Sequence, residues 1–125
     1  MIYGIGTDIV EISRVESALN RWGTRFMARV YTDGEIAYCK KKASPASRFA
    51  MRFAAKEAFV KALGTGFRSG LSFQQIEVIR GKNGAPGFRL HGKSQSIVRQ
   101  NGIRNSFLSL SDDGSYALAF VVLES

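Results

Sequence analysis

The chain has 125 residues, which suffices for one domain over residues 1–125 with a core of its own and leaves no room for a second. Hydrophobic residues make up 45% and charged residues 22%, so a disordered chain is excluded, and the longest apolar run, 116–123, is too short to span a bilayer. The formal net charge of +8 favours an anionic partner: nucleic acid, anionic lipid, a phosphorylated small molecule or an acidic protein.

The cysteine content and the N-terminal segment indicate the cellular compartment in which the protein is expected. The single cysteine, Cys39, excludes an internal disulfide bond and suits a reducing environment, and we expect it to be a small buried hydrophobic residue. The N-terminal segment has no basic region and soon meets the carboxylate of Asp8, unlike a secretory signal peptide. We therefore expect a cytoplasmic protein without a membrane partner.

The first predicted element is a strand over residues 2–12, with glycines at positions 4 and 6. The pattern Ser13-x-x-Glu16 is typical of a capping box and predicts that a helix follows, although Gly23 weakens the prediction for its second half. This helix would carry an apolar stripe and a basic face beside it. The stripe comprises Val15, Leu19, Trp22 and Phe26, and the basic face comprises Arg14, Arg21 and Arg25.

Two further helices are predicted in the first half of the chain. A second capping box, Thr32-x-x-Glu35, predicts a short helix that runs through Lys40-Lys41-Lys42. Ser44 followed by Pro45 is typical of an N-cap with proline at the first helical position, and it predicts a long helix to Leu63. Gly64 is well placed to end that helix.

The second half of the chain is rich in predicted hairpins. Strands are expected over 73–80 and 88–91 around the turn Asn83-Gly84, and over 106–110 and 116–123 around Asp112-Asp113-Gly114, with a short helix over 93–101 between the two pairs. The order β-α-α-α-β-β-α-β-β predicts an α+β fold. A largely antiparallel sheet would pack against the long helix and the shorter helices.

Two carboxylates interrupt apolar patterns. Glu57 lies within the apolar face of the long helix, one turn before Lys61, and Asp8 interrupts the first strand. An unpaired carboxylate in such a place is unfavourable. Glu57 could pair with Lys61, and Asp8 could bond to the backbone of its own turn. Alternatively, the two carboxylates could share one ligand.

A shared magnesium ion would explain both carboxylates together with the excess of basic residues. Magnesium in proteins is typically held by one or two carboxylates, several waters and the phosphates of a substrate. Lysine and arginine side chains would then bind the remaining phosphate charge. The pattern thus favours phosphate chemistry at a Mg²⁺ ion held by Asp8 and Glu57.

Several motifs resemble those of the 4′-phosphopantetheinyl transferase family, in particular of its holo-acyl-carrier-protein synthases. The first is Gly4-Ile5-Gly6-Thr7-Asp8-Ile9-Val10-Glu11-Ile12 followed by Arg14. The second is Arg52-Phe53-Ala54-Ala55-Lys56-Glu57-Ala58, continuing to Lys61 and Gly64-Thr65-Gly66. Asn83-Gly84-Ala85-Pro86 and Leu108-Ser109-Leu110-Ser111 also fit, so the resemblance spans essentially the whole chain.

The resemblance implies transfer of the phosphopantetheine group of coenzyme A to a serine of apo-acyl carrier protein, with release of adenosine 3′,5′-bisphosphate. It implies that Asp8 and Glu57 bind the metal, that Glu57 helps to deprotonate the serine, directly or through a metal-bound water, and that Lys61 stabilises charge on the pyrophosphate. It further implies the family fold, a homotrimer with active sites between subunits, and a coenzyme A site shaped by Arg52, Lys61, Gly64, Thr65, Gly84 and Pro86.

The acidic carrier protein implied by the resemblance would dock on the basic face formed by Arg14, Arg21 and Arg25. One position departs from the family pattern: this chain has Asp112 after Ser111, where many members have a histidine that helps to hold the 3′-phosphate. Arg48 or the run Lys40–Lys42 could replace that contact, or the loop could be arranged differently. We expect His91, the only histidine, to be a surface residue and not a substitute.

Two other classes of protein would account for the charge. A nucleic-acid-binding module needs basic residues interleaved with exposed aromatic residues, whereas most phenylalanines here, including Phe26, Phe53 and Phe120, have spacings typical of a core. A non-catalytic adaptor that docks acidic proteins would not need Glu57 and Lys61 within an apolar stripe. The enzyme is the favoured interpretation.

Overall fold

The computed structural model describes residues 1–68 and 70–125. In chain order the elements are β1 (Ile2–Glu11), α1 (Ile12–Trp22), α2 (Thr24–Val30), α3 (Asp33–Lys40), α4 (Pro45–Leu63), the 3₁₀ turn η1 (Phe73–Gln75), β2 (Ile76–Arg80), β3 (Pro86–Leu90), α5 (Gly92–Gln100), β4 (Asn105–Asp112) and β5 (Tyr116–Glu124). The predicted α+β class is confirmed. Among the described residues, no helix has the length and apolarity that crossing a membrane requires.

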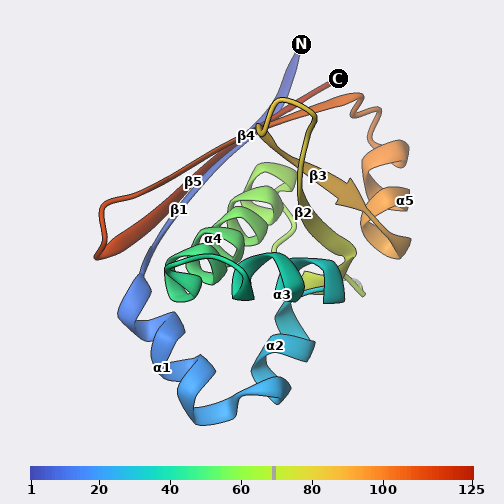
Figure 1. The fold of residues 1–125 in the computed structure, drawn as a ribbon. Helices are drawn as coiled ribbons and strands as arrows, with labels where there is room; N and C mark the ends of the chain where they lie inside the picture. The colour runs from blue at the N-terminus through green and yellow to red at the C-terminus, as the bar shows by residue number, and fades with distance from the viewer. Residues whose placement is uncertain (69) are drawn as a thin grey trace.

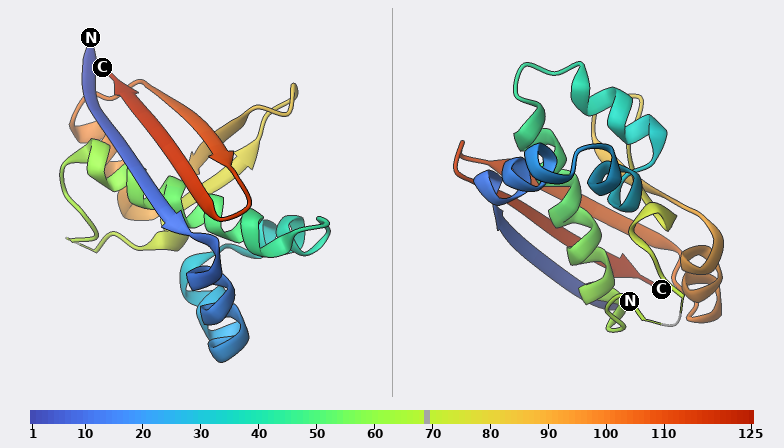
Figure 2. Two further views of the ribbon diagram at one scale, coloured as in Figure 1. Left: turned by 90° about the vertical axis from the view of Figure 1, so that its left-hand side faces the viewer. Right: turned by 90° about the horizontal axis from the view of Figure 1, so that it is seen from below.

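The strands form two antiparallel sheets. One has the order β1-β5-β4, so the first and last strands of the chain lie side by side, and the other is the β2-β3 hairpin. Helix α4 lies against one face of the three-stranded sheet, and α1 and α2 lie on the side of α4 that faces away from the sheet, as Figures 1 and 2 show. The largely antiparallel sheet packed on a long helix is therefore as predicted.

The core lies between α4 and the inner face of the three-stranded sheet. Strand β5 alternates strictly, and its inward residues are all buried: Ala117, Ala119, Val121 and Leu123. Most residues of α4 between Phe49 and Leu63 are also buried, because the sheet, the β2-β3 hairpin and the short helices surround this helix on several sides.

The local signals around α3 and α4 are confirmed. Thr32 and Glu35 form the reciprocal capping box, and Pro45 occupies the first turn of α4. Gly64 ends α4 in the left-handed conformation, with φ of 81°. Helix α3 ends at Lys40, two residues before the predicted end.

The predicted first helix is wrong in two respects. Residues Ser13 and Glu16 form no capping box, since the helix begins at Ile12, Glu11 is its N-cap, and no side chain caps it. The helix also breaks at Gly23, whose φ of 53° and ψ of −125° are incompatible with a continuous helix. Residues after Gly23 belong to α2, which runs in another direction (Figure 1).

The other elements differ from prediction mainly at their ends. Residues 73–75 form the 3₁₀ turn, so β2 begins at Ile76, and the predicted helix 93–101 appears as α5. Strand β4 is longer than predicted at both ends, whereas β5 begins as predicted at Tyr116 and ends one residue later, at Glu124. Phe120, which was predicted to lie in the core, points outward from β5 and is exposed.

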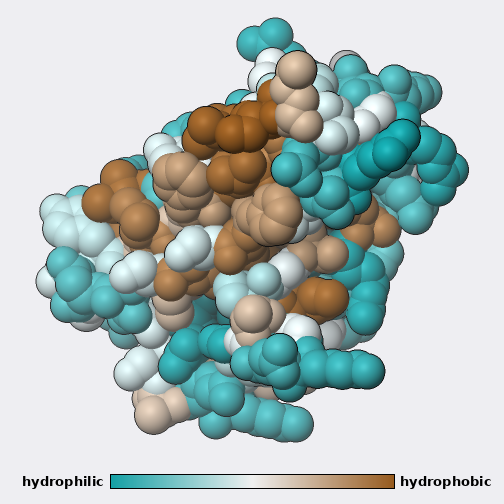
Figure 3. Space-filling model, turned by 90° about the horizontal axis from the view of Figure 1, so that it is seen from above, coloured by the Kyte–Doolittle hydropathy of each residue, from teal (hydrophilic) through white to brown (hydrophobic). Residues whose placement is uncertain are grey.

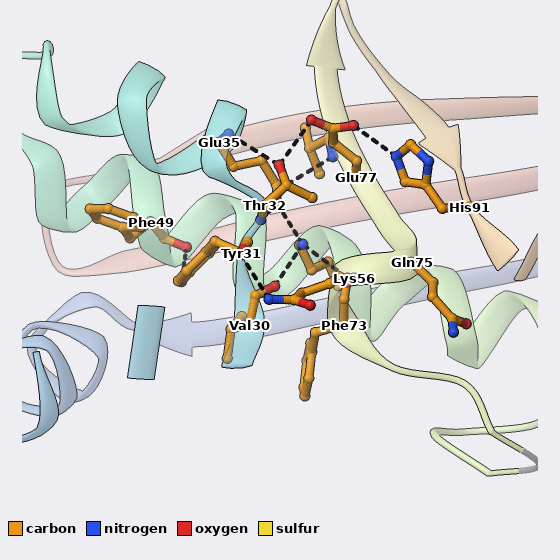
Figure 4. Close-up of polar contacts among 12 residues, drawn as sticks. Val30, Tyr31, Thr32, Glu35, Phe49, Lys56, Phe73, Gln75, Glu77 and His91 are labelled. Atoms are coloured by element: carbon orange, nitrogen blue, oxygen red, sulfur yellow. Dashed lines mark hydrogen bonds and ion pairs between the residues drawn. The ribbon is translucent and has the colours of Figure 1, made fainter. Parts of the chain in front are cut away.

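A buried ion pair joins four elements to α4. Lys56 and Glu35 are fully buried, and the ammonium nitrogen of Lys56 lies 2.7 Å from Oε1 of Glu35. The same nitrogen donates to the carbonyl oxygens of Val30 and Phe73, at 2.8 and 3.0 Å. Oε2 of Glu35 accepts the backbone N–H of Val78, so both charges are fully hydrogen-bonded (Figure 4).

The network continues to the surface. Thr32 donates its backbone N–H to Glu35 and its hydroxyl to Glu77, whose other oxygen lies 2.9 Å from Nε2 of His91. His91 is exposed, as predicted. These contacts fasten α3 and β2 to α4, the helix on which Glu57 lies next to Lys56.

We expect Lys56→Met to lower the free energy of unfolding by about 3–5 kcal/mol, because the variant leaves the carboxylate of Glu35 buried without a counter-charge. Chemical denaturation followed by circular dichroism, at one fixed protein concentration, measures the loss. Lys82→Met, at an exposed lysine, is the matched control and should change stability by less than about 0.5 kcal/mol. Equal stability of the two variants would contradict the structural role of the pair.

Candidate active site

Two glycines place β1 directly on the backbone of α4. A Cβ built at Gly4 would overlap the carbonyl oxygen of Ala62, and one built at Gly6 would overlap that of Ala58. Any side chain at these positions would push the strand away from the helix. The inward positions of β1 are the even-numbered ones, so Asp8 follows Gly4 and Gly6 on the face that meets α4.

Asp8 and Lys61 are paired across this contact. The Nζ of Lys61 lies 3.0 Å from Oδ1 of Asp8 and also donates to the carbonyl oxygen of Thr7 at 3.0 Å. The side chain of Asp8 is 17% exposed and that of Lys61 is 53% exposed. The ammonium group is therefore at the surface, and the carboxylate is mostly enclosed.

Glu57 belongs to the same cluster but does not pair with Lys61. The predicted alternative of a Glu57–Lys61 ion pair is wrong, since Lys61 turns towards Asp8 on the neighbouring strand. Glu57 is half-buried. Burial raises the pKa of Glu57, the nearby carboxylate of Asp8 raises it further, and Lys61 acts in the opposite direction. Two acidic groups thus approach each other in a partly dehydrated place that favours a cation.

A first cleft of about 320 Å³ opens at these carboxylates. Residues from β1, α1, α2 and α4 line it: Asp8, Ile9, Val10, Arg14, Val15, Ala18, Phe26, Phe53 and Glu57. Its walls are mainly apolar and its charged groups lie together, an arrangement typical of a small-molecule site.

The donor set fits magnesium in number and kind. Asp8 and Glu57 supply carboxylate oxygens, and no cluster of three or more His, Cys, Asp or Glu side chains suited to a metal occurs in residues 1–68 and 70–125. Two carboxylates leave the other coordination positions to waters and phosphate oxygens, as magnesium prefers. A transition-metal site with nitrogen or sulfur ligands does not fit this donor set.

A second cleft, of about 270 Å³, lies on the other side of α4, beside β4. It is lined by Arg48, Met51, Arg52, Arg80, Pro86 and the strand residues 108–112. Arg52 and Glu57 are five residues apart on α4, so they point about 140° apart around the helix axis. The structure therefore separates Arg52 and Pro86 from Asp8, Glu57 and Lys61 within one chain.

The remaining predicted coenzyme A residues lie at the ends of elements. Gly64 and Thr65 follow Lys61 directly at the C-terminal end of α4. Gly84, with φ of 78°, lies in the β2-β3 turn, and its carbonyl oxygen accepts a hydrogen bond from Arg80. Gly64 and Thr65 thus lie on the side of Lys61 and the carboxylates. Gly84 lies on the side of Arg52 and Pro86.

The three predicted docking arginines do not share one helix face, because Arg25 lies beyond the break at Gly23. Arg14 lines the first cleft, and Arg21 packs over the ring of Trp22 at 4.9 Å. Trp22 is 49% exposed, so the predicted core-facing stripe is wrong at this position. A neighbouring hollow of about 450 Å³ is lined by Trp22, Arg25, Phe26 and Arg29.

Phe26 lines both this hollow and the first cleft, so the basic surface around Trp22 is continuous with the carboxylates. An exposed tryptophan among arginines is typical of a protein-binding surface. The helical pattern indicated Arg14 and Arg21, whereas Arg29 had no separate signal in the sequence.

Other residues of interest lie away from the carboxylates. Cys39 is buried, as predicted, and burial raises the pKa of its thiol to about 11, so it is not a reactive nucleophile. Arg48 lies in the second cleft together with Asp112, whereas no residue of the run Lys40–Lys42 lines it. Arg80 is an additional cation there, and no motif or spacing in the sequence indicated it.

Comparison with known proteins agrees with this geometry. Residues 4–121 match the sequence profile of the 4′-phosphopantetheinyl transferase superfamily. The holo-acyl-carrier-protein synthase of Geotalea daltonii is 48% identical over 124 residues, covering 99% of each chain. The crystal structure of the Neisseria meningitidis holo-acyl-carrier-protein synthase superposes with a TM-score of 0.93, at 40% identity over the full length of both chains.

A third relative has been solved with coenzyme A bound. The Helicobacter pylori holo-acyl-carrier-protein synthase, in complex with coenzyme A, superposes with a TM-score of 0.85 at 36% identity, covering 96% of this chain and 99% of that one. The chain therefore belongs to the 4′-phosphopantetheinyl transferase superfamily and, within it, to the holo-acyl-carrier-protein synthases. The predictions of an enzyme and of the transferase fold are confirmed.

We expect Gly6→Ala to destabilise the fold by about 1–3 kcal/mol and to abolish transferase activity, because the added methyl group forces β1, and with it Asp8, away from α4. Denaturation and an activity assay at matched folded concentration measure the two effects. Gly87→Ala, where a Cβ meets nothing within 4 Å, is the control and should retain wild-type stability. A fully stable and active Gly6→Ala protein would contradict the close contact.

Proposed function

We propose that the chain transfers the 4′-phosphopantetheine group of coenzyme A to a serine of an apo-acyl carrier protein and releases adenosine 3′,5′-bisphosphate. The reaction depends on Mg²⁺ held by Asp8 and Glu57. The observation that carries the proposal is the convergence of Asp8, Glu57 and Lys61 at a cleft, in a chain that belongs to this family. The family assignment favours the transferase over a nucleic-acid-binding module.

The serine oxygen forms a bond to the phosphorus that carries pantetheine, and the pyrophosphate bond to adenosine 3′,5′-bisphosphate breaks. Bound magnesium would neutralise charge on the pyrophosphate and orient its oxygens. Glu57 accepts the serine proton, because its carboxylate lines the cleft that is continuous with the surface proposed to bind the carrier. Lys61 has an exposed ammonium group beside Asp8, from which it reaches the pyrophosphate and stabilises its charge.

The coenzyme A residues fall into two groups that one chain does not bring together. Lys61, Gly64 and Thr65 lie near the carboxylates, whereas Arg52, Gly84 and Pro86 lie around the second cleft. We therefore propose that coenzyme A binds between two subunits, with its pyrophosphate at the first cleft of one and the adenosine phosphate at the second cleft of its neighbour. Each copy, residues 1–125, acts as one domain.

The outer face of the three-stranded sheet supports association between copies of the chain, and the family resemblance makes a homotrimer the proposed assembly. Its outward side chains form an apolar surface, visible in Figure 3, that includes Ile5, Ile9, Phe107, Leu118 and Phe120. Antiparallel sheets usually have one solvated, polar face, so an exposed apolar face marks an interface. A second copy of the chain is the proposed occupant, because this surface spans β1 and β4, the two strands whose inner sides border the two clefts.

The carrier protein is proposed to dock on the surface formed by Arg14, Arg21, Trp22, Arg25 and Arg29. This surface is basic and continues into the first cleft through Phe26. An acidic carrier bound here would have its serine next to Glu57. Complementary charge would steer the encounter and fix the orientation more than it would add affinity.

Mass spectrometry of an apo-acyl carrier protein incubated with the chain, coenzyme A and Mg²⁺ tests the function. The expected result is the addition of one phosphopantetheine group to the carrier serine and the formation of adenosine 3′,5′-bisphosphate. The same incubation with EDTA should give no product. An unmodified carrier in the presence of coenzyme A and Mg²⁺ would refute the proposal.

The metal site is tested by Glu57→Gln, which keeps the size of the side chain and removes its charge. We expect weaker Mn²⁺ binding in calorimetry, at least about tenfold lower transfer, and unchanged or slightly higher thermal stability, since the variant relieves repulsion from Asp8. Glu16→Gln, at an exposed position of α1, is the matched control. Normal turnover of Glu57→Gln at low Mg²⁺ would show that Glu57 is not a ligand.

The docking surface is tested by Arg21→Glu. We expect the KM for the carrier protein to rise about tenfold with little change in the KM for coenzyme A, and the rate at low carrier concentration to depend less on salt than in the wild type. Arg99→Glu makes the same change of charge on α5, away from this surface. A parallel rise of both KM values, or equal effects of the two variants, would argue against docking at Arg21.

A further inference from the structure

Tyr38 lies among cations from three segments of the chain. The Cζ of Arg52, on α4, is 4.2 Å from the centre of the Tyr38 ring, and the Cζ of Arg80, on β2, is 5.7 Å from it. The Nζ of Lys42, just after α3, is at 4.7 Å. All three distances are within the range in which the electron-rich face of an aromatic ring attracts a cation.

These cations have no carboxylate partner in the part of the chain that the structure describes. None of the three ion pairs among those residues involves Lys42, Arg52 or Arg80. Arg52 is only 3% exposed, yet its Nε has no hydrogen-bond acceptor. A buried guanidinium group with an unused N–H donor is unfavourable unless an anion accepts that hydrogen bond and balances the charge.

The position of Tyr38 explains how like charges can converge without being neutralised. A carboxylate between Arg52 and Arg80 would order both side chains, but it would also use the charge with which they bind an anion. A tyrosine ring attracts both guanidinium groups by cation–π interaction and so restricts their positions, but it does not neutralise their charge. The pKa of Tyr38 reflects this setting: partial burial acts to raise it, but the charge of Arg80, the contact of Arg80 with the hydroxyl group, and the charges of Lys42 and Arg52 together lower it.

We propose that Tyr38 is a positioning residue of the coenzyme A site, whose ring holds the guanidinium groups of Arg52 and Arg80 towards the second cleft, where they bind a phosphate group. The inference rests on the proposed function, which assigns Arg52 to coenzyme A. It also accounts for the departure at Asp112. The cleft that contains this acid is lined by three arginines, Arg48, Arg52 and Arg80, so a net positive charge remains without a histidine.

Two substitutions separate the ring from the hydroxyl group. Tyr38→Leu removes the aromatic face, and we expect it to raise the KM for coenzyme A and the dissociation constant of adenosine 3′,5′-bisphosphate, measured by calorimetry, about tenfold. The turnover number and the KM for carrier protein should stay within about twofold of the wild type, because the first cleft is untouched. Tyr38→Phe keeps the ring and loses only the contact of the hydroxyl group with Arg80, so it should retain wild-type affinity within about threefold.

Arg52→Ala is the reference for the assay, and it should weaken binding of adenosine 3′,5′-bisphosphate at least as much as Tyr38→Leu. If the wild type does not modify the carrier, the proposed function fails. If the wild type is active and Arg52→Ala weakens binding while Tyr38→Leu does not, the role of Tyr38 is refuted. A Tyr38→Leu protein that melts at a lower temperature but binds adenosine 3′,5′-bisphosphate normally would also refute it, since Tyr38 would then be structural only.

Discussion

The direct contact between the backbone of β1 and that of α4 is the constraint on which the rest of the site depends. Gly4 and Gly6 lack the side chain that would separate strand from helix, and they lie opposite Ala62 and Ala58. Because side chains alternate along a strand, this contact brings Asp8 to the helix within reach of Lys61 and close to Glu57. Because Gly4 and Gly6 have no side chains, residues from two sequence motifs meet in one site.

The sequence predicted those parts of the structure that have local causes. The limits of α4 follow from Pro45 and Gly64, and the capping box of α3 follows from Thr32 and Glu35. The helical period placed Glu57 within the apolar stripe of α4, and this side chain is half-buried in the structure. In each case a short stretch of sequence contains both the signal and its physical reason.

Contacts between residues far apart in the sequence could not be predicted, because no local pattern indicates them. Lys61 pairs with Asp8, 53 residues away in sequence, instead of with Glu57 one turn before it. The ammonium of Lys56 is buried because acceptors from α2, α3 and η1 surround it, and no periodicity in α4 indicates them. Trp22 and Phe120 have spacings typical of a core, yet both are exposed on proposed binding surfaces. Apolar spacing alone does not distinguish a core from an interface.

One chain thus has a carboxylate cleft and an arginine cleft on opposite sides of α4, and we propose that two copies combine them into one site. The most direct test mixes two impaired proteins, Asp8→Ala and Arg52→Ala, by joint unfolding and refolding, at a coenzyme A concentration below the wild-type KM. If neighbouring subunits share the site, some mixed interfaces contain both intact clefts, and the mixture should regain about one quarter of the wild-type activity under random assembly. A mixture no more active than the average of the two separate variants would place the whole site within a single chain and contradict a site shared between subunits.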